Sequence, residues 1–380
     1  MKKVKLGEIC EIQAGGTPSR NKKEFWVQGN IPWVKIKDIN SKYISKVEEH
    51  ITELGLQFSS AKLFSRGTIL YTIFATIGEV AILDIDAATN QAIAGLHLKS
   101  EKVLKDYLYF FLLSIKNRVK NDSRGVAQNN INLTYLKNIE VPIVENSIQQ
   151  EICNNLTKIN QIITQRNQQL VELSNLVKSR FNEMFGDPVL NEMGWEIATL
   201  NKVGTIGRGV SKYRPRNASE LFGGIYPFIQ TGDVANSGNY IVDYHSTYSE
   251  FGLKQSKLWD KGTLCITIAA NIAKTSILAF DSCFPDSIVG FISGERTNNM
   301  FIHYWFSYFQ NILESQAPES AQKNINLKIL SELKVILPPL SLQNEFADFV
   351  AQVDKSQLAI QKSLEELETL KKSLMQEYFG

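Results

Sequence analysis

The chain has 380 residues and a mass of 42.9 kDa, which is enough for two or three ordinary domains with their own cores. A hydrophobic fraction of 43%, with 21% charged and 10% aromatic residues, excludes collagenous and intrinsically disordered classes. The formal net charge of +2 falls short of the strongly basic balance of many nucleic-acid binders, so composition alone does not reveal the function.

The sequence contains no segment typical of a membrane span or a secretory signal. Its longest nearly apolar runs, residues 69–77 and 80–83, are far below the ~18 residues that a membrane span needs. The opening segment MKKVKLGEIC places Gly7 and Glu8 where a secretory signal would carry its apolar region. We therefore expect a cytoplasmic protein that has no membrane partner.

The cysteines predict free thiols. They are widely separated and form no C-x-x-C pair, and the histidines are equally scattered. Neither a disulfide framework nor a structural metal is expected. The four cysteines are Cys10, Cys153, Cys265 and Cys283.

Strand patterns and helical patterns follow one another twice along the chain. Apolar and β-branched runs predict strands at Thr68–Phe74 and Val80–Leu83, and helical spacing predicts a helix at Val103–Val119. The fold class is therefore α+β (mixed α/β). The second series is strands at Thr263–Ala269 and Ser276–Phe280 and a helix at Asn299–Glu314.

The chain is an internal repeat. Residues Ala127–Glu151 align without gaps with Ala321–Glu345 at an offset of 194, and 11 of the 25 aligned positions are identical. Further upstream the similarity is weaker and the offset is 195, as for Asp38 and Asp233. Since a repeat fixes architecture more firmly than local propensity, we expect one fold that carries two different surfaces.

Each copy ends in a long predicted helix that starts near Ser147 or Ser341. Apolar residues at alternating spacings of three and four continue through five heptads, which predicts a coiled-coil seam in each. Roughly 38 residues at ~1.5 Å each give a rod of ~57 Å. Two such helices could pair and hold the globular parts apart; the alternative is two ordinary amphipathic helices, each packed on its own domain. The seam residues are Ile152, Leu156, Ile159, Ile163, Leu170, Leu173, Val177, Phe346, Val350, Val353, Ile360, Leu364, Leu367 and Leu374.

These patterns divide the chain into four parts. The predicted globular domains are residues 1–146 and 187–340, and the predicted long helices are residues 147–186 and 341–380.

Motifs of catalysis and cofactor binding are missing from the sequence. The segment G-T-I-G-R-G-V-S at residues 204–211 lacks the lysine of a phosphate-binding loop. Neither G-x-S-x-G nor H-E-x-x-H occurs, and the Asn-Pro-Pro-aromatic motif of amino-methyltransferases is also missing. We therefore expect a binding protein that is not an enzyme and binds no cofactor or metal itself.

Basic residues gather on glycine-containing loops in both copies. Residues 202–216 hold five basic residues and no acidic one, and the stretch 15–26 of the first copy is also basic. Such cations suit phosphate contacts, and Arg, Asn and Gln can read base edges; for each residue the alternative is a solvated surface loop. The candidates for DNA contact are Arg20, Lys22, Lys23, Lys35, Lys37, Arg124, Gln128, Asn129, Arg208, Lys212, Tyr213, Arg214, Arg216, Gln230, Lys274, Gln322 and Lys323.

A second pair of loops, Asp122–Asn130 and Ser315–Asn324, is rich in amides. Gln128 and Asn129 could read adenine edges. The asparagines shared by both copies are interpreted as caps or backbone hydrogen-bonding groups. They are Asn130 and Asn324, and Asn132 and Asn326.

Several motifs together resemble one known family. They are L-G-E-I at residues 6–9 with G-G-T-P-S at 15–19, I-P-W-V-K-I-K-D-I at 31–39, G-T-I-L at 67–70, the repeated N-I-N-L and Q-x-E, and M-F-G-D-P at 184–188. Over its whole length the chain is similar to the specificity subunit of type I restriction-modification systems. In the second copy the opening motif is degraded, and Phe228 stands in the place of Trp33.

The resemblance implies two target-recognition domains, each reading one half of a bipartite, asymmetric DNA target, with the two long helices packed antiparallel as a spacer. It also implies a non-catalytic subunit that docks two modification (methyltransferase) subunits, which bind S-adenosylmethionine and methylate adenine. Restriction subunits that use ATP with Mg2+ would join where present. The source would then be bacterial or archaeal.

Two other classes remain open from the residues themselves. One is a protein-binding scaffold with two globular modules on a coiled-coil spacer. The other is a methyltransferase with recognition and catalysis in one chain, which the missing Asn-Pro-Pro motif opposes.

Overall fold

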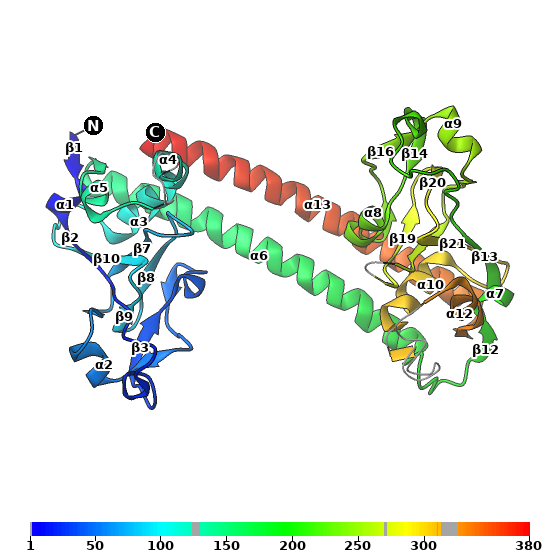
Figure 1. Cartoon of the computed structure of the whole chain (residues 1–380), viewed down its shortest axis with the longest axis horizontal. Helices are drawn as coiled ribbons and strands as arrows, with labels where there is room; N and C mark the ends of the chain where they lie inside the picture. Colours follow the sequence, from blue (N-terminus) through cyan, green and yellow to red (C-terminus); the bar gives the residue numbers. More distant parts are fainter. Residues whose placement is uncertain (1, 124–129, 270–271, 310, 313–324) are drawn as a thin grey trace. The chain divides into compact units, whose positions relative to one another are not determined.

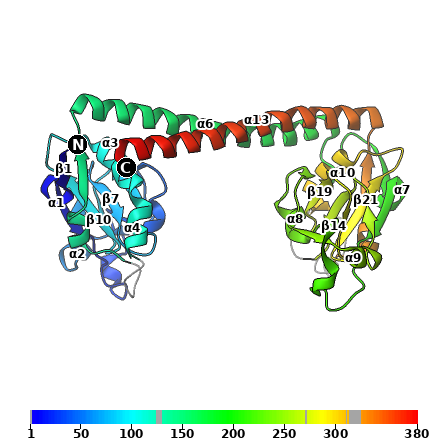
Figure 2. The same ribbon diagram turned by 90° about the horizontal axis from the view of Figure 1, so that it is seen from above.

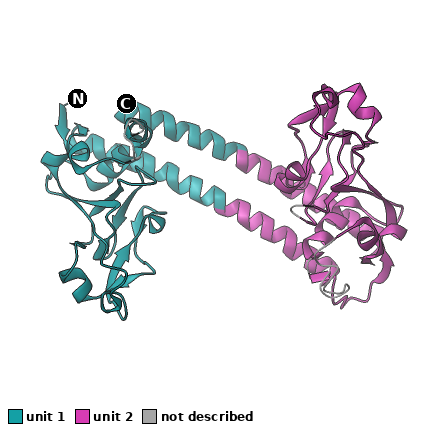
Figure 3. Cartoon of the chain, in the orientation of Figure 1, with its two compact units in different colours: residues 1–167, 362–380 teal, residues 168–361 magenta. Residues whose placement is uncertain are grey.

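The computed structural model describes residues 2–123, 130–269, 272–309, 311–312 and 325–380. The chain forms two compact units (Figure 3). Unit 1 consists of residues 1–167 and 362–380, and unit 2 consists of residues 168–361. Unit 1 therefore combines the first part of the chain with its last residues.

Unit 1 contains short strands, the helices beside them and parts of two long helices (Figure 1). In chain order the elements are β1 (Lys2–Lys5), α1 (Leu6–Ile9), β2 (Cys10–Ala14), η1 (Lys23–Phe25), β3 (Ile31–Val34), η2 (Ile36–Asp38), β4 (Tyr43–Ile44), β5 (His50–Ile51), α2 (Glu53–Gln57), β6 (Leu63–Phe64), β7 (Ile69–Thr72), β8 (Val80–Leu83), β9 (Ala87–Thr89), β10 (Ile93–Leu98), α3 (Lys105–Ser114), α4 (Lys116–Asp122), α5 (Leu133–Lys137), β11 (Glu140–Ile143) and the start of α6 (Asn146–Phe185).

Unit 2 repeats this plan. Its elements are β12 (Glu196–Thr199), α7 (Leu200–Val203), β13 (Gly204–Arg208), η4 (Ser219–Leu221), β14 (Phe222–Phe228), α8 (Thr231–Asn236), β15 (Tyr240–Ile241), β16 (Ser246–Tyr248), α9 (Glu250–Lys254), β17 (Leu258–Trp259), β18 (Leu264–Thr267), β19 (Thr275–Leu278), β20 (Ser282–Cys283), β21 (Ile288–Ser293), α10 (Asn299–Trp305), η5 (Phe306–Tyr308), α12 (Leu327–Glu332), β22 (Lys334–Leu337) and the start of α13 (Leu340–Phe379).

The sheets of the two units have the same topology. Unit 1 has a five-stranded sheet in the order β2-β10-β7-β8-β4 and a four-stranded sheet in the order β5-β3-β9-β6. Unit 2 has β13-β21-β18-β19-β15 and β16-β14-β20-β17 in the corresponding places. In each unit the first strand also pairs antiparallel with the last short strand, β1 with β11 and β12 with β22. The repeat and the α+β fold class predicted from the sequence are thereby confirmed.

The predicted strands are present, most of them with shifted ends. They appear as β7, β8, β18 and β19; β8 has the predicted bounds, and the other three are shorter than their apolar runs. The helix predicted at Val103–Val119 is two helices, α3 and α4, which break at Ile115. Both long helices begin one residue earlier than predicted, and α6 ends before Gly186, whose φ of +74° is the left-handed conformation that glycine adopts readily after a helix.

The core of unit 1 lies between the five-stranded sheet, α3 and parts of both long helices. Ile152 and Leu156 of α6 are buried in it. Phe379, near the end of α13, packs on the rings of Tyr107 and Phe111, with ring centroids 5.2 and 5.9 Å away. The end of α13 therefore helps to complete the core of unit 1.

Aromatic rings dominate the core of unit 2. Phe181 and Phe185 of α6 contact Phe301 of α10 and Phe346 of α13, with ring centroids 4.9 to 5.7 Å apart. All four side chains are almost completely buried. Since each large aromatic side chain buries 150–250 Å², this cluster fixes α6 and α13 to the body of unit 2.

Contacts inside unit 2 show that α6 and α13 run antiparallel. Gln357 Nε2 donates to Ser174 Oγ at 3.2 Å, and Arg180 Nη2 lies 3.1 Å from Glu345 Oε1. Residue numbers rise along α6 as they fall along α13. Within unit 1 the start of α6 likewise meets the end of α13 (Figure 2), where Asn155 Nδ2 donates to the Tyr378 hydroxyl at 3.3 Å.

Two predictions about individual residue types are also confirmed. Asn132 and Asn326 cap α5 and α12, because their Oδ1 atoms accept from the backbone N–H groups of Tyr135 and Ile329 at 2.8 and 3.0 Å. The four cysteines are free and buried. Asn130 forms an isolated bridge with Phe74, and Asn324 lies outside the described residues.

Candidate nucleic-acid interface

The candidate cations of unit 1 lie where the loop after β2 meets the four-stranded sheet. Arg20 and Lys22 are on this loop, Lys23 starts η1, and Lys35 and Lys37 flank the start of η2 after β3. Lys35 is partly buried and the other four are exposed. The structure brings three of them, Arg20, Lys35 and Lys37, together beside the segment that precedes β5.

Two glutamates before β5 bind three of these cations. Glu49 pairs with Arg20, whose Nη2 lies 2.7 Å from Oε2, and also with the Lys35 ammonium group. Glu48 pairs with Lys37. The hydrogen bond from Lys35 holds the pKa of Glu49 below its usual range, with a further contribution from Arg20.

Arg20 is also held by aromatic rings. Its guanidinium carbon lies 3.7 Å from the ring centroid of Trp26 and 4.8 Å from that of Trp33. The Trp33 indole donates in turn to the carbonyl of Gly16 at 3.1 Å. Cation–π and ion-pair contacts of this kind orient a guanidinium in advance of binding.

Glu48 and Glu49 were not among the residues indicated by the sequence, because they lie outside the basic loop, with Glu49 29 residues from Arg20. Such pairs at a protein surface stabilise by only about 0–1 kcal/mol. A DNA phosphate could therefore replace the carboxylates as the partner of these cations.

In unit 2 the corresponding basic loop is fixed by hydrogen bonds. The Gln255 side chain accepts from the backbone N–H groups of Lys212 and Tyr213 at 2.7 and 3.0 Å. The Tyr213 hydroxyl donates to Glu220 at 2.8 Å, and Ser256 Oγ donates to the carbonyl of Val210 at 2.8 Å. Gln255 is a further residue that the sequence did not indicate, since it lies more than forty positions away from Lys212 on the chain.

The arginines of this loop have different partners. Arg214 donates to the carbonyls of Ser211 and Tyr213, both at 2.8 Å. Arg216 pairs with the carboxylate of Asp286 at 2.8 Å, and Arg208 Nε donates to the backbone carbonyl of the same residue. Lys212 is exposed. The loop therefore exposes one lysine to solvent, and it lies near arginines whose orientation is set by hydrogen bonds and an ion pair within the protein.

Lys35 and Gln230 occupy equivalent places in the two units. Each precedes a short helix, and each backbone N–H donates at 2.8 Å to an aspartate three residues later, Asp38 or Asp233. The repeated aspartate fixes the turn, while the side chain at the variable position differs in charge between the units. Gln230 is exposed and lies with Arg216 at one cavity of about 370 Å³.

The remaining candidates lie apart from these loops or outside the described residues. Lys274 is exposed next to β19, and its backbone N–H donates to Thr267 Oγ1 at 3.0 Å. The candidates outside the described residues are Arg124, Gln128, Asn129, Gln322 and Lys323.

The predicted seam residues lie on the buried or partly buried sides of α6 and α13. Those near the ends of the helices join the cores, as Leu156 does in unit 1 and Val350 in unit 2. The buried seam residues are Ile152, Leu156, Ile159, Ile163, Val177, Phe346, Val350 and Val353, and the partly buried ones are Leu170, Leu173, Ile360, Leu364, Leu367 and Leu374.

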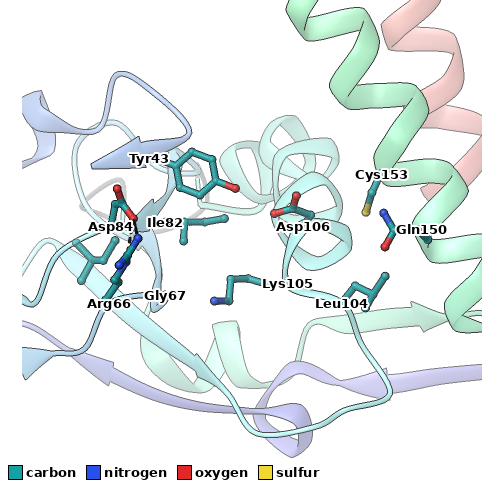
Figure 4. Close-up of a pocket in the computed structure, with 11 residues that line it drawn as sticks. Tyr43, Arg66, Gly67, Ile82, Asp84, Leu104, Lys105, Asp106, Gln150 and Cys153 are labelled. Atoms are coloured by element: carbon teal, nitrogen blue, oxygen red, sulfur yellow. Dashed lines mark hydrogen bonds and ion pairs between the residues drawn. The ribbon is translucent and has the colours of Figure 1, made fainter. Parts of the chain in front are cut away.

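A second cavity, of about 610 Å³, lies in unit 1 beside the start of α6 (Figure 4). Its charged groups are of both signs, and Arg66 pairs with Asp84 at 2.7 Å. Burial raises the pKa of the Cys153 thiol to about 11, so this cysteine is not activated as a nucleophile. Of the candidate DNA contacts that the structure describes, none lines this cavity.

Among the described residues, His, Cys, Asp and Glu side chains form no group of three or more that could hold a metal ion. No helix in the same part of the chain is long and apolar enough to cross a membrane.

Comparison with known proteins identifies the family. The model of the type I restriction modification DNA specificity domain matches residues 1–173 and 192–370. The type I restriction enzyme MjaIX specificity subunit of Methanocaldococcus jannaschii is 23% identical over 98% of this chain and 90% of that protein. The EcoprrI specificity subunit of Escherichia coli is 24% identical over 92% of this chain and 86% of that protein.

Solved structures have the same fold. The S subunit of a type I restriction-modification system from M. genitalium matches with a TM-score of 0.59 at 15% identity, covering 100% of this chain and 96% of that one. A chain from a study of complex assembly in the type I system matches with a TM-score of 0.64 at 18% identity, covering 100% and 97%. This chain therefore belongs to the family of type I restriction-modification specificity subunits, which are DNA-recognition proteins and not enzymes.

Proposed function

We propose that the chain is the sequence-specific DNA-binding subunit of a type I restriction-modification complex, and that each unit reads one half of a bipartite, asymmetric target. One observation carries this proposal. The two units share the strand order of their sheets, but they place different side chains at equivalent positions, such as Lys35 and Gln230. One backbone frame with two different reading surfaces suits a target with two different halves.

DNA affinity would come mainly from the cations of the loops after β2 and β13. Phosphate contacts supply affinity and register, and contacts to base edges supply specificity. Arg20 and Lys35 would exchange Glu49 for phosphate, and exposed lysines such as Lys212 would add further contacts. Gln230 could read an adenine through paired hydrogen bonds.

The two long helices would set the spacing between the half-sites and dock the partner subunits. Each has 40 residues, which corresponds to about 60 Å of α-helix. The partners would be two modification subunits that bind S-adenosylmethionine and methylate adenine in each half-site. Restriction subunits that use ATP with Mg2+ would join where they exist, and the complex would act in the cytoplasm.

The decisive experiment is a map of methylated adenines across the genome of the source cell, with and without this gene. We expect deletion to remove methylation at one split, asymmetric motif and at no other. A variant with Arg20 and Lys35 both changed to Ala should weaken methylation of that motif, and Glu101→Gln, on the surface of unit 1, serves as the control. An unchanged map in a cell with an active type I methyltransferase would overturn the proposal in favour of a protein-binding scaffold.

A further inference from the structure

We propose that the cavity of unit 2 beside Phe228 receives a single nucleobase turned out of the DNA duplex. This inference rests on the proposed function, because it assumes that unit 2 binds DNA. It adds a binding site for one base to the contacts that loop cations make with phosphates.

The lining of the cavity combines aromatic rings with polar side chains, and the polar side chains are called its rim below. Its volume is about 370 Å³, at the lower end of the range for small-molecule sites. Phe228 and Tyr248 both line it and stack on each other with centroids 4.0 Å apart and an interplanar angle of 21°, and Tyr248 is only 1% exposed. Phe222 also lines it, with its ring centroid 5.9 Å from that of Phe228. The polar lining residues include Arg216, Gln230 and Ser287.

Unit 1 fills the equivalent place with its own side chains. Trp33 corresponds to Phe228, because each pairs with the equivalent central strand of its four-stranded sheet, β9 or β20. The Arg20 guanidinium lies over both Trp33 and Trp26 and is held there by Glu49. A flat, hydrogen-bonding group therefore already stacks at this position in one unit.

The described residues of unit 2 provide no such occupant. Arg214 follows β13 by six residues, as Arg20 follows β2, but its guanidinium donates to the carbonyls of Ser211 and Tyr213. The position of Glu49 is taken by Ser246, which pairs with Phe228 in the sheet. Without the arginine and its carboxylate, the place beside the rings is a cavity.

The chemistry of the rim favours a nucleobase over a cationic side chain from a partner protein. The nearby carboxylate of Asp286 already pairs with Arg216, so an incoming ammonium or guanidinium group would compete with Arg216 for it. The amide of Gln230 and the hydroxyl of Ser287 can both donate and accept, which suits the edge of a base. The basic loop that contributes Arg216 suits the phosphate on either side of that base.

Base extrusion has a characteristic energetic signature. Turning a base out of the stack costs a few kcal/mol, and it costs least when the base is already mismatched. Aromatic stacking in the protein offsets part of this cost. A mismatch at the extruded position should therefore tighten binding, whereas mismatches at positions read in the groove should weaken it.

The experiment measures binding of the full chain to duplexes that carry the motif found by methylation mapping. Each base pair of the motif is mismatched in turn by changing one strand only. We expect one position at which the mismatch tightens binding about tenfold or more, and at which 2-aminopurine becomes strongly fluorescent or quenched on binding. Ser287→Trp, which fills the cavity, and Gln230→Ala, which shortens its rim, should both reduce this gain.

Asn236→Ala is the matched control, because this exposed residue of α8 in unit 2 does not line the cavity. If the chain binds the matched duplex normally and a mismatch tightens binding at no position, this inference is overturned and the proposed function remains intact. The inference is also overturned if a mismatch tightens binding equally in the unchanged chain, in Ser287→Trp and in Gln230→Ala. Failure to bind any duplex would remove the proposed function and the inference together.

Discussion

Gln149 and Gln343 make the same three hydrogen bonds at the same position of the two repeats. Gln149 accepts from the backbone N–H of Leu104 and donates to the carbonyls of Lys102 and Val144, each at 2.8 Å. Gln343 does the same with Asn298, Arg296 and Pro338 at 2.8 to 3.1 Å. Both side chains are fully buried, so each joins the first turns of a long helix to the body of its unit.

Replacing either glutamine by leucine should therefore destabilise its unit. Gln149→Leu leaves a buried N–H group and two carbonyls without these partners, and we expect a loss of about 2–4 kcal/mol in the free energy of unfolding. Urea denaturation measures it. Gln150→Leu is the control, because this neighbouring glutamine is exposed; equal losses for the two variants would show that the buried hydrogen bonds contribute little.

Glu49→Gln should strengthen binding to duplex DNA of random sequence. The change frees Arg20 and Lys35 from their carboxylate, and we expect affinity to rise about two- to tenfold at low salt and by less as salt screens the charges. Fluorescence anisotropy titrations at several salt concentrations measure the effect. Glu53→Gln changes the net charge equally from an exposed position on α2; an equal gain there would assign the effect to net charge alone.

Removing exposed loop lysines should reduce the salt dependence of DNA binding. For Lys23→Ala and Lys212→Ala we expect weaker binding at low salt, and a slope of log affinity against log salt that is smaller by about one for each lysine. The loss should shrink as salt rises, because fewer counterions are released. Lys372→Ala, exposed on α13, is the control, and a slope that falls as much in this variant would argue against contacts specific to the loops.

Unit 2 should lose stability in mild acid because of His303. Burial lowers the pKa of this imidazole from 6.5 to about 4. Its ring nitrogens meet Thr275 Oγ1 at 2.9 Å and Asn239 Oδ1 at 3.1 Å, and Asn239 in turn donates to Asp354 of α13. Between these pH values the unfolded chain binds a proton that the folded chain does not, so stability falls as pH falls.

The expected loss from this histidine between pH 7.5 and pH 5 is about 2 kcal/mol. Urea denaturation at the two pH values measures it, and His303→Gln, which keeps a hydrogen-bonding side chain without an ionisable ring, should flatten the dependence. His50→Gln in unit 1 is the control. Equal acid sensitivity of the unchanged chain and His303→Gln would rule this imidazole out as the cause.

The parts of the fold that follow from periodicity were predictable from the sequence. The heptads of residues 147–186 and 341–380 indicated long helices, and the repeated N-I-N-L motif indicated two copies of one fold. The four-stranded sheets gave no comparable signal, because strands such as β5 and β6 have two residues each. Phe181 and Phe185 lie off the predicted seam, and only the packed structure shows that they belong to a core.

The candidate site was predictable only in part. Charge and glycine content identified the basic loops, but the partners of Arg20 and Lys212 come from distant segments through Glu49 and Gln255. Sequence spacing cannot show that two loops meet across a sheet. The cavity beside Phe228 depends on the direction in which Arg214 points, which the identity of the residue does not determine.

The packing of Phe379 against Tyr107 and Phe111 has a consequence for biosynthesis. The residues that complete the first hydrophobic core leave the ribosome only after the whole of residues 168–361 has been made. Until then the surface that receives α13 is exposed in the nascent chain. Unit 1 therefore reaches its final packing after translation of unit 2, and a ribosome that stalls in the second half of the message leaves the N-terminal half with an incomplete core.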